Sequence, residues 1–401
     1  MKQNKHALVI GGSLGGLFAG LLLRQAGWEV DIYERVAGEL SGRGAGIVVQ
    51  PQLIERLRAL GLDPADLGVP VHTRKLFDVD GGVAATHECP QILTAWERVY
   101  RFLRDAFPAE HYHRGKALAG FTQNAGSVVA TFADGSEAKG DILVGADGFR
   151  STVRQLLLPD LLPQYAGYVA WRALLNEAAF PAQTHAEVFP FMAFGLPPGE
   201  QFLGYPVAGI DNDLRPGHRR YNVVWYRPAG ETTGLVDLLT DAHGFTHAIS
   251  IPPPLIRREV IEDMRAAAER LLGRQFREVV QLIDEPILQP IYDLETPHMA
   301  FGRVAILGDA AFVARPHVAA GVTKAADDAA ALADALVTNE DVEAALRRFE
   351  TERLAANRRI IERARHLGAY LQATQSEDEL ARSQRHGNAQ AVLAETAVLD
   401  S

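Results

Sequence analysis

The chain has 401 residues, and 40 Lys and Arg residues against 50 Asp and Glu residues give it a formal net charge of −10. The length predicts two or three domains, and the acidic balance argues against nucleic acid as a partner, because such binding needs a positively charged surface. The single cysteine excludes an internal disulfide framework. Since no apolar run reaches the roughly 18 residues of a membrane span, we expect a cytoplasmic protein with no membrane partner.

The first predicted elements form a β-α-β unit. It comprises a strand over 7–10, a helix over 13–26 that ends at Gly27, and a strand over 29–33. Further helices are predicted over 51–60 and 96–107, and the pair Asp134-Gly135 indicates a hairpin. An apolar strand over 142–144 follows.

The character of the chain changes between about residues 165 and 294. Aromatic residues and prolines become more frequent there, the run 221–226 alternates as an antiparallel strand does, and 259–272 is predicted to be a helix. After residue 301 the α/β pattern returns, with a strand over 304–307, an alanine-rich helix over 321–336 and a long amphipathic helix over 342–371. We therefore predict a nucleotide-binding domain that is interrupted by a mostly antiparallel domain.

The first motif, residues 11–16, reads Gly-Gly-Ser-Leu-Gly-Gly and lies between the first strand and the first helix. Glycines here permit a tight turn and let backbone N–H groups meet a pyrophosphate at a helix N-terminus. Glu34 ends the second strand, where a carboxylate accepts hydrogen bonds from ribose hydroxyls. The pattern predicts a dinucleotide site without separating NAD from FAD, and an ordinary glycine-rich turn is the alternative.

Two more motifs each follow an apolar strand. The second motif, residues 145–154, holds Asp147 and Gly148 before a helix, and by itself it can be a turn with a helix cap at Asp147 or Ser151. The third motif, residues 308–321, begins with Gly-Asp-Ala-Ala. A carboxylate after a strand can hold a polyol hydroxyl, and the N-terminus of the next helix can stabilise negative charge on a nearby ring.

In this order and spacing the three motifs resemble the FAD-dependent aromatic hydroxylases of the para-hydroxybenzoate hydroxylase type, over about residues 6–370. The resemblance implies an α/β (α+β) fold with a discontinuous, Rossmann-like FAD-binding domain made of residues 1–75, 95–165 and 295–340. It also implies a substrate domain, mostly an antiparallel β-sheet, made of 76–94 and 166–294. A C-terminal helical region over 341–372, with the long helix, and a loosely ordered tail over 373–401 complete the prediction.

The resemblance also implies which residues bind FAD. Gly11, Gly16 and Glu34 match the ADP-binding positions, Asp147 and Gly148 the Asp-Gly motif associated with FAD and the pyridine nucleotide, and Asp309 the aspartate on the ribityl chain. Pro316 and Gly321 match the loop that leads to the flavin ring. The predicted FAD-binding set is Gly11, Ser13, Leu14, Gly16, Glu34, Arg35, Arg98, Asp147, Gly148, Asp309, Pro316, Ala319, Ala320 and Gly321.

The sequence departs from the family in several informative places, which include Thr323 at the position of a usual asparagine. Phe312 stands where a histidine is usual, and the Gly-Gln-Gly loop reads Ala319-Ala320-Gly321. The usual position of a flavin-contacting arginine holds Trp96, with Arg98 and Arg101 nearby, so the choice between these two arginines stays open.

Three runs, residues 46–51, 165–172 and 315–321, resemble a narrower group within this family, the hydroxylases of 2,6-dihydroxypyridine. The resemblance implies a monooxygenase that binds FAD, consumes NADH or NADPH and O₂, and hydroxylates a small hydroxylated aromatic or N-heterocyclic ring. A flavin-dependent reductase or oxidase without oxygen insertion is the alternative, and a non-catalytic dinucleotide-binding protein is a further one. A homodimer is expected because the family often dimerises.

Two residues are predicted to act on the substrate. His317, beside the flavin loop, is the first candidate for the base that removes a ring-hydroxyl proton, because imidazole has an unperturbed pKa of about 6.5. A helix cap or a contact with a carbonyl is the alternative. Tyr205 is the candidate for holding a substrate hydroxyl, with a packed strand residue as the alternative.

Four aromatic residues and the histidines complete the candidates. The aromatic residues predict either an apolar wall around a flat ring or ordinary core packing, and they are Phe189, Phe191, Phe194 and Trp225. The histidines are scattered, with His111 and His113 the one tight pair, so no metal site is predicted.

Overall fold

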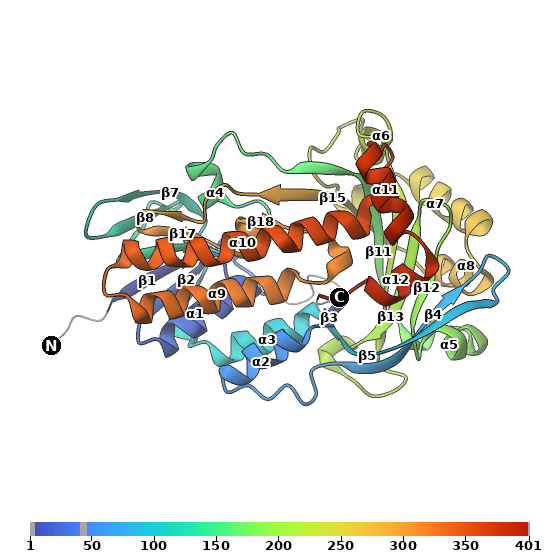
Figure 1. Cartoon of the computed structure of the whole chain (residues 1–401), viewed down its shortest axis with the longest axis horizontal. Coiled ribbons are helices and arrows are strands. Elements are labelled where there is room, and N and C mark those ends of the chain that lie inside the picture. Colours follow the sequence, from blue (N-terminus) through green and yellow to red (C-terminus); the bar gives the residue numbers. More distant parts are fainter. Residues whose placement is uncertain (1–4, 41–45, 400–401) are drawn as a thin grey trace.

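The computed structural model describes residues 5–40 and 46–399, and its strands form two large sheets and a small one (Figure 1). The first large sheet has six strands in the order β16-β17-β10-β1-β2-β6. Its bounds are β1 His6–Ile10, β2 Glu29–Glu34, β6 Tyr112–Arg114, β10 Ile142–Gly145, β16 Ala300–Phe301 and β17 Val304–Ile306. All strand pairs are parallel except β16 with β17.

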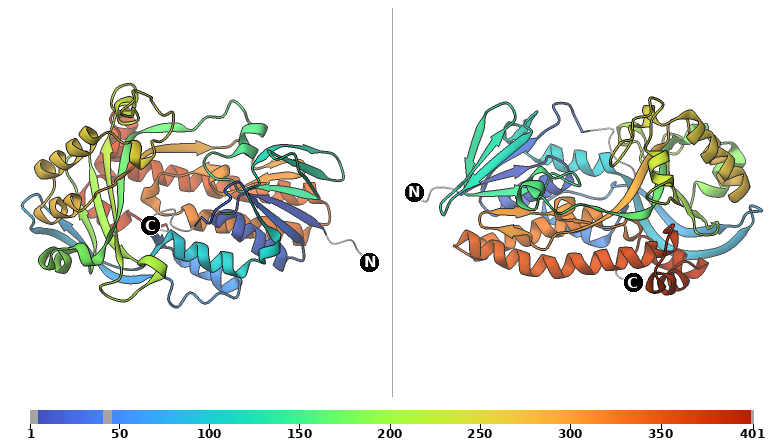
Figure 2. Two further views of the ribbon diagram at one scale, coloured as in Figure 1. Left: turned by 180° about the vertical axis from the view of Figure 1, so that it is seen from behind. Right: turned by 90° about the horizontal axis from the view of Figure 1, so that it is seen from above.

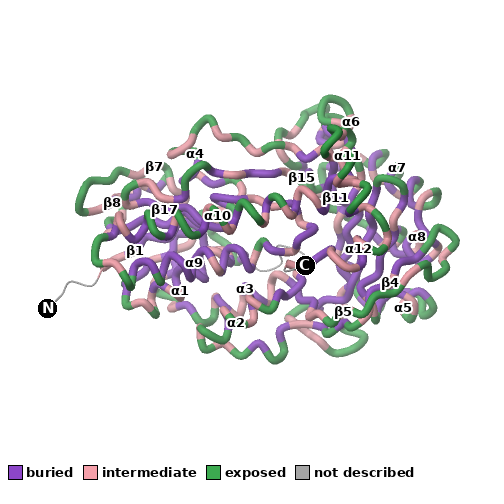
Figure 3. The backbone as a smooth tube through the Cα atoms, viewed as in Figure 1, coloured by how far each residue is buried: buried purple, intermediate pink, exposed green. Residues whose placement is uncertain are grey.

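The central strands β1, β10 and β17 are apolar runs because helices cover the sheet. Residues 7–9 of β1 and 142–144 of β10 are fully buried, as expected for strands with both faces covered. The helices that pack on this sheet and on one another are α1 Leu14–Gln25, α2 Pro51–Ala59, α3 Trp96–Ala106, α9 Gly321–Thr338 and α10 Val342–Gly368. Burial follows the strands and the facing sides of α1 and α9 (Figure 3).

The second large sheet has nine strands in the order β18-β15-β11-β14-β13-β12-β4-β5-β3. All neighbours are antiparallel except β12 with β4. Its bounds are β3 Gly46–Val49, β4 Val69–Phe77, β5 Val83–Ala95, β11 Gln164–Asn176, β12 Met192–Gly195, β13 Gln201–Val207, β14 Arg220–Pro228, β15 Ile287–Glu295 and β18 Phe312–Val313.

The two faces of the nine-stranded sheet have different neighbours. The outer face packs on α5 Ala182–Val188, α7 Arg258–Leu271 and α8 Arg274–Gln281, on the side away from the six-stranded sheet (Figure 2). The inner face carries an apolar cluster shared with the C-terminal residues, and its members include Tyr168, Tyr205, Tyr226, Leu393 and Ala397. Alternate residues of β14 explain the division, since Val224 and Tyr226 face inward whereas Val223 and Trp225 face outward.

The small sheet contains the predicted hairpin. It consists of β7 Leu118–Gln123, β8 Val128–Phe132 and β9 Glu137–Gly140, all antiparallel. Gly135 has φ = 80°, the left-handed conformation that a tight turn between β8 and β9 uses. The remaining helices are α4 Thr152–Leu157 and α6 Gly234–Leu238. The predicted fold class, with an α/β domain, a mostly antiparallel sheet and a long C-terminal helix, is confirmed.

Two details of the predicted organisation are wrong. The tail beyond residue 373, predicted to be loosely ordered, forms α11 Glu377–His386 and α12 Ala389–Glu395, and α11 begins with a capping box between Ser376 and Glu379. Leu393 is buried in the inner face of the nine-stranded sheet, which explains why the segment is held. Residues 46–49 and 69–75, predicted in the FAD-binding domain, pair with the nine-stranded sheet. The other domain boundaries stay predictions.

None of the helices within the described residues is long and apolar enough to cross a membrane. The tight histidine pair of the sequence has a polar partner instead of a metal-like arrangement. His113 Nε2 and His111 Nδ1 lie 2.7 and 3.1 Å from Asp31 Oδ1, and His6 Nε2 lies 2.7 Å from Asp31 Oδ2. In the described ranges 5–40 and 46–399 no cluster of His, Cys, Asp or Glu has an arrangement that would hold a metal ion.

Candidate active site

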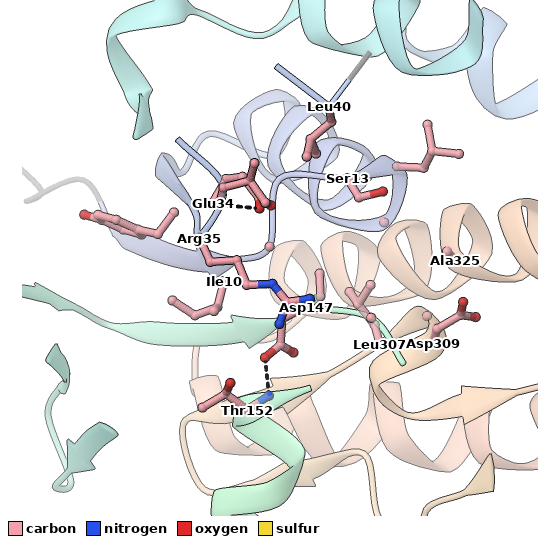
Figure 4. Close-up of a pocket in the computed structure, with 18 of the residues that line it drawn as sticks. Ile10, Ser13, Glu34, Arg35, Leu40, Asp147, Thr152, Leu307, Asp309 and Ala325 are labelled. Carbon is pink, nitrogen blue, oxygen red and sulfur yellow. Dashed lines mark hydrogen bonds between the residues drawn. The ribbon is translucent and has the colours of Figure 1, made fainter. Parts of the chain in front are cut away.

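The three glycine-bearing motifs meet in one cavity of about 480 Å³ at the carboxyl ends of β1, β2, β10 and β17 (Figure 4). Parallel α/β sheets bind ligands at this edge, where the strand order changes direction. The lining from the predicted FAD set comprises Gly11, Ser13, Leu14, Glu34, Arg35, Asp147, Gly148, Asp309 and Gly321. The structure thus brings together residues that lie far apart in the sequence.

The first motif has glycine where the backbone leaves no room for a side chain. Gly11 has φ = +106°, and a Cβ on it would lie 2.4 Å from the carbonyl oxygen of Ala146. A Cβ on Gly16 would lie 1.8 Å from the carbonyl oxygen of Gly11. Ser13, the N-cap residue of α1, makes no side-chain capping bond, so the first N–H groups of the helix face the cavity region without a side-chain acceptor. This turn fits the pyrophosphate of a dinucleotide.

Glu34 is held in a fixed position at the end of β2. Its Oε2 accepts a hydrogen bond from Gly12 N at 2.8 Å, and its Oε1 accepts one from Val36 N at 2.9 Å. Each carboxylate oxygen has a second lone pair, and Glu34 lines the cavity, so it fits the ribose hydroxyls of a dinucleotide. Figure 4 shows the adjacent Arg35 extending toward Asp147.

Asp147 of the second motif both caps a helix and lines the cavity. It accepts hydrogen bonds from Ser151 Oγ at 2.5 Å, from Thr152 N at 2.7 Å and from Val153 N at 3.1 Å, all at the start of α4. Burial raises the pKa of this carboxyl. Asp147 therefore caps α4, as the alternative interpretation predicted, and it also lines the cavity.

Arg154 connects the second motif to the third, a role that the sequence analysis missed. It is 2% exposed, and its guanidinium donates to the carbonyl oxygens of Phe149 at 2.6 Å and Ala310 at 3.0 Å. Backbone carbonyls as partners leave no trace in the sequence. The sequence around Arg154, which contains Ser151, Thr152 and Gln155, gave no signal of this role.

Asp309 projects into the cavity from the start of the third motif (Figure 4). The protein around it raises the pKa of its carboxyl by desolvation, and Lys324 partly opposes this effect. Lys324 is 1% exposed in the first turn of α9, with Nζ 3.8 Å from Asp328 Oδ2 and no hydrogen-bond partner within the described parts of the chain. Sequence analysis missed this buried ammonium, which is paired with the Asp328 carboxylate and does not line the cavity.

The two predicted substrate residues lie outside the 480 Å³ cavity, at the inner face of the nine-stranded sheet. His317 is 2% exposed, a hydrogen bond of 2.8 Å joins its Nε2 to the Tyr168 hydroxyl, and its ring centroid lies 4.4 Å from that of Tyr226. Its Nδ1 has no partner among the residues that the structure describes. Tyr205 is 4% exposed, and burial raises its pKa to about 12.

Sequence analysis missed two tyrosines and an arginine on this face. Tyr168 and Arg172 share the inward side of β11, and Tyr226 stands on the inward side of β14. Arg172 lies close enough to Tyr205 and Tyr226 to lower the pKa of each, against the larger effect of burial. The two-residue alternation of the strands was the signal that could have grouped them.

Several predicted residues occupy other surroundings. Arg98 donates to the carbonyl oxygen of Asn212 at 3.3 Å, and Trp96, not Arg98, lines the cavity. Gly16, Pro316, Ala319 and Ala320 border the cavity's segments without lining it. The predicted aromatic wall is wrong for Phe189 and Trp225, which belong to the outer core, and Phe191 contacts Lys75, whereas Phe194 belongs to the inner face. The role of each residue in binding FAD stays a prediction.

His317 makes stability depend on pH in a defined direction. Burial, together with the Arg315 guanidinium, lowers its pKa to about 3, whereas an unfolded chain has a histidine pKa of about 6.5. Below pH 6.5 the unfolded chain therefore binds a proton that the folded protein does not, so stability falls as the pH falls toward 3. Between pH 7 and pH 5.5 we expect the wild type to lose about 1 kcal/mol more than His317→Gln in urea unfolding. Equal losses would contradict a neutral, buried His317.

Comparison with known proteins agrees with this geometry. A family model described as an FAD binding domain matches residues 4–182 and 283–364, and one described as FAD binding domain-like matches 165–293. The chain is 34% identical to 2,6-dihydroxypyridine 3-monooxygenase of Paenarthrobacter nicotinovorans, over 91% of each protein. It is 29% identical to 3-amino-4-hydroxybenzoate 2-monooxygenase of Streptomyces cremeus, over 90% of this chain and 86% of that one.

A solved structure has the same architecture. The 2,6-dihydroxypyridine-3-hydroxylase from Arthrobacter nicotinovorans superposes with a TM-score of 0.86 at 32% identity, over 93% of this chain and 94% of that one. The agreement therefore extends over both sheets and the three motifs. The chain belongs to the family of FAD-binding aromatic monooxygenases.

Proposed function

We propose that this monooxygenase hydroxylates a small hydroxylated N-heterocyclic ring, with 2,6-dihydroxypyridine as the first candidate. The 34% identity over 91% of the chain with a hydroxylase of that ring carries the proposal, and it exceeds the 29% identity with an aminohydroxybenzoate enzyme. The inner face of the nine-stranded sheet supports it, because polar groups of Tyr205, Tyr226 and His317 stand within an apolar cluster. Such a mixture suits a flat ring with polar substituents.

The FAD-binding set fits the cofactor through the glycine turn, the fixed Glu34 carboxylate and Asp309 in the cavity. FAD held there would supply the two-electron redox chemistry by which NADH or NADPH and O₂ hydroxylate the ring, with the second oxygen atom leaving as water. The chain's own residues bind and orient the ring and exclude water.

His317 and Tyr168 form the proposed proton-handling pair. Because its pKa is about 3, His317 is neutral at pH 7 and does not store a proton. Its Nδ1, which has no partner among the described residues, instead accepts a hydrogen bond from the ring hydroxyl, while its Nε2–H donates to the Tyr168 hydroxyl at 2.8 Å and so fixes the tautomer. Tyr205 holds a ring substituent from the neighbouring strand. A neutral hydrogen-bond acceptor distinguishes this proposal from a free imidazole base.

A panel of rings tests the proposed substrate class. Purified enzyme with FAD is given 2,6-dihydroxypyridine, 6-hydroxynicotinate, hydroxybenzoates and phenol, each with NADH and with NADPH under ¹⁸O₂. We expect the dihydroxypyridine to give the fastest coupled oxidation and a product that carries one labelled oxygen. Faster turnover of a benzoate would overturn the ring assignment, and product without label would favour the reductase or oxidase alternative.

Removing the imidazole separates binding of FAD from hydroxylation. We expect His317→Ala to keep FAD while turnover to product falls about 100-fold, the usual contribution of a positioned proton-transfer group. Tyr168→Phe, which keeps the ring and removes the hydroxyl, should give a smaller loss. Unchanged product formation in His317→Ala would remove the proposed role.

The cytoplasmic location and the homodimer stay predictions, and light scattering on the purified protein checks the homodimer.

A further inference from the structure

One backbone unit near the C-terminus joins three segments that border the proposed substrate site. The N–H of Ala397 donates to the carbonyl oxygen of His317 at 2.7 Å. The carbonyl oxygen of Ala397 accepts hydrogen bonds from Gln50 Nε2 at 3.1 Å and from Gln91 Nε2 at 2.9 Å. Gln50 directly follows β3, and Gln91 belongs to β5. Ala397 therefore links the third motif to two strands of the nine-stranded sheet.

The backbone conformation of Ala397 shows that hydrogen bonds from several segments fix this link. Its φ is +58°, in the left-handed region that is unfavourable for L-residues. Such a conformation persists where the surroundings fix it. Ala397 is 3% exposed, and its peptide groups have the three partners just described. A passive tail would have relaxed to an ordinary backbone conformation.

A buried arginine provides the second anchor of the segment. Arg74 is fully buried in β4, and within the described residues it has no ion pair. Its guanidinium donates to the carbonyl oxygen of Leu393 at 2.7 Å and to Gln91 Oε1 at 2.6 Å. Because a buried charge is costly unless its hydrogen bonds are satisfied, Arg74 requires both Leu393 and Gln91. Gln91 thus connects Arg74 to Ala397.

Side-chain packing places the same segment against the substrate residues. Val392, Leu393 and Ala397 belong to one apolar cluster with Tyr205 and Tyr226. The helix α12 packs against β4 and β5, on the face of the sheet opposite α5 and α8 (Figure 1). The segment therefore covers the inner face on which the ring is proposed to bind.

We propose that residues 388–399 form a wall of the substrate site, and that Gln50 and Gln91 are positioning residues that hold the His317 loop through the Ala397 peptide. This rests on the proposed function. In coupled turnover, NAD(P)H, a proton, O₂ and the ring give NAD(P)⁺, the hydroxylated ring and water. When water enters the site, NAD(P)H, a proton and O₂ give NAD(P)⁺ and hydrogen peroxide, and the ring is unchanged. By excluding water, the wall therefore raises the amount of hydroxylated ring formed relative to hydrogen peroxide.

The test uses the full chain with FAD and compares three variants. The double variant Gln50→Ala/Gln91→Ala lacks both side-chain donors to the Ala397 carbonyl oxygen. Gln91→Glu keeps an acceptor for Arg74 but removes one donor to Ala397. Gln123→Ala is the matched control, because Gln123 Nε2 also donates to a backbone carbonyl, that of Phe301 at 3.0 Å, but in the small sheet away from the site.

Two measurements are made on each variant. Hydrogen exchange should speed up about fivefold or more at residues 316–320 and 389–399 in the double variant and in Gln91→Glu, and not in Gln123→Ala. Product formed per NAD(P)H oxidised should fall about threefold or more in both, with hydrogen peroxide accounting for the difference, while FAD is retained.

The outcomes separate the wall from the proposed function. Unchanged exchange in both segments overturns the positioning role, whatever the activity. Faster exchange with an unchanged product ratio shows that the link is structural only and overturns the wall. If the wild type hydroxylates no ring of the panel, the proposed function fails, and the exchange measurement still decides whether Gln50 and Gln91 hold the loop.

Discussion

Gly16→Ala is expected to lower the free energy of unfolding by about 3 kcal/mol, at the upper end of the usual cost of overpacking, and to abolish tight FAD binding. The added Cβ would stand 1.8 Å from the carbonyl oxygen of Gly11, and a backbone atom has no rotamer by which to move away. The turn must therefore open, which shifts the N-terminus of α1 from the cavity. Urea unfolding of the FAD-free protein and fluorescence titration with FAD measure the two effects.

Gly15→Ala is the matched control for stability. A Cβ on Gly15 would lie 3.5 Å from Leu307 Cδ1 and 3.6 Å from Ala325 Cβ, which are ordinary contacts. Because alanine favours a helix over glycine by about 1 kcal/mol, the FAD-free Gly15→Ala protein should be at least as stable as the wild type. A Gly16→Ala protein as stable as Gly15→Ala and the wild type would show that the turn tolerates the added Cβ and that its geometry has been misjudged.

Arg154→Met is expected to destabilise the protein by about 3 kcal/mol or more, because it leaves buried carbonyl groups without donors. The carbonyls of Phe149 and Ala310 lose their partner, so the second and third motifs are no longer joined. FAD affinity should fall with stability, since Asp147 and Asp309 stand on the two segments that Arg154 connects.

Arg150→Met controls for the loss of a positive charge in the same motif. Arg150 is exposed and donates to Ser250 Oγ at 2.7 Å, so its replacement should change stability by less than about 0.5 kcal/mol. Thermal unfolding of both variants, with and without FAD, gives the comparison. If Arg154→Met unfolds at the same temperature as the wild type and retains FAD, the two motifs are held together by other contacts.

The sequence predicted the parts of the site that depend on short stretches of chain. Each motif directly follows a buried parallel strand, and parallel strands end at one edge, so the place of the cavity and part of its lining followed from local patterns. Glu34 and Asp309 were predicted because a carboxylate after a strand can accept hydrogen bonds from sugar or polyol hydroxyls, and both residues line the cavity.

Contacts between distant segments were the ones missed. The bond between Tyr168 and His317 joins a strand of one sheet to a loop beside the other, and neither local sequence indicates it. The ordered C-terminal segment was misjudged because its composition is polar, and its anchors are backbone carbonyls at Leu393 and Ala397 that receive side chains from β4 and β5. Trp225 was misplaced because the aromatic residues of β14 alternate between the two faces.

The strand order of the six-stranded sheet governs when the cofactor site can exist during synthesis. β1, β2 and β10 are made first, but β17, which pairs with β10, and the Gly308-Asp309 turn emerge only after the whole nine-stranded sheet except β18 has been translated. A nascent chain that already holds Glu34 and Asp147 therefore lacks the segment that Arg154 must contact. The contact between His317 and Ala397 forms later still. A chain that ends before residue 308 would consequently lack part of the cavity lining and the carbonyl group of Ala310 to which Arg154 donates.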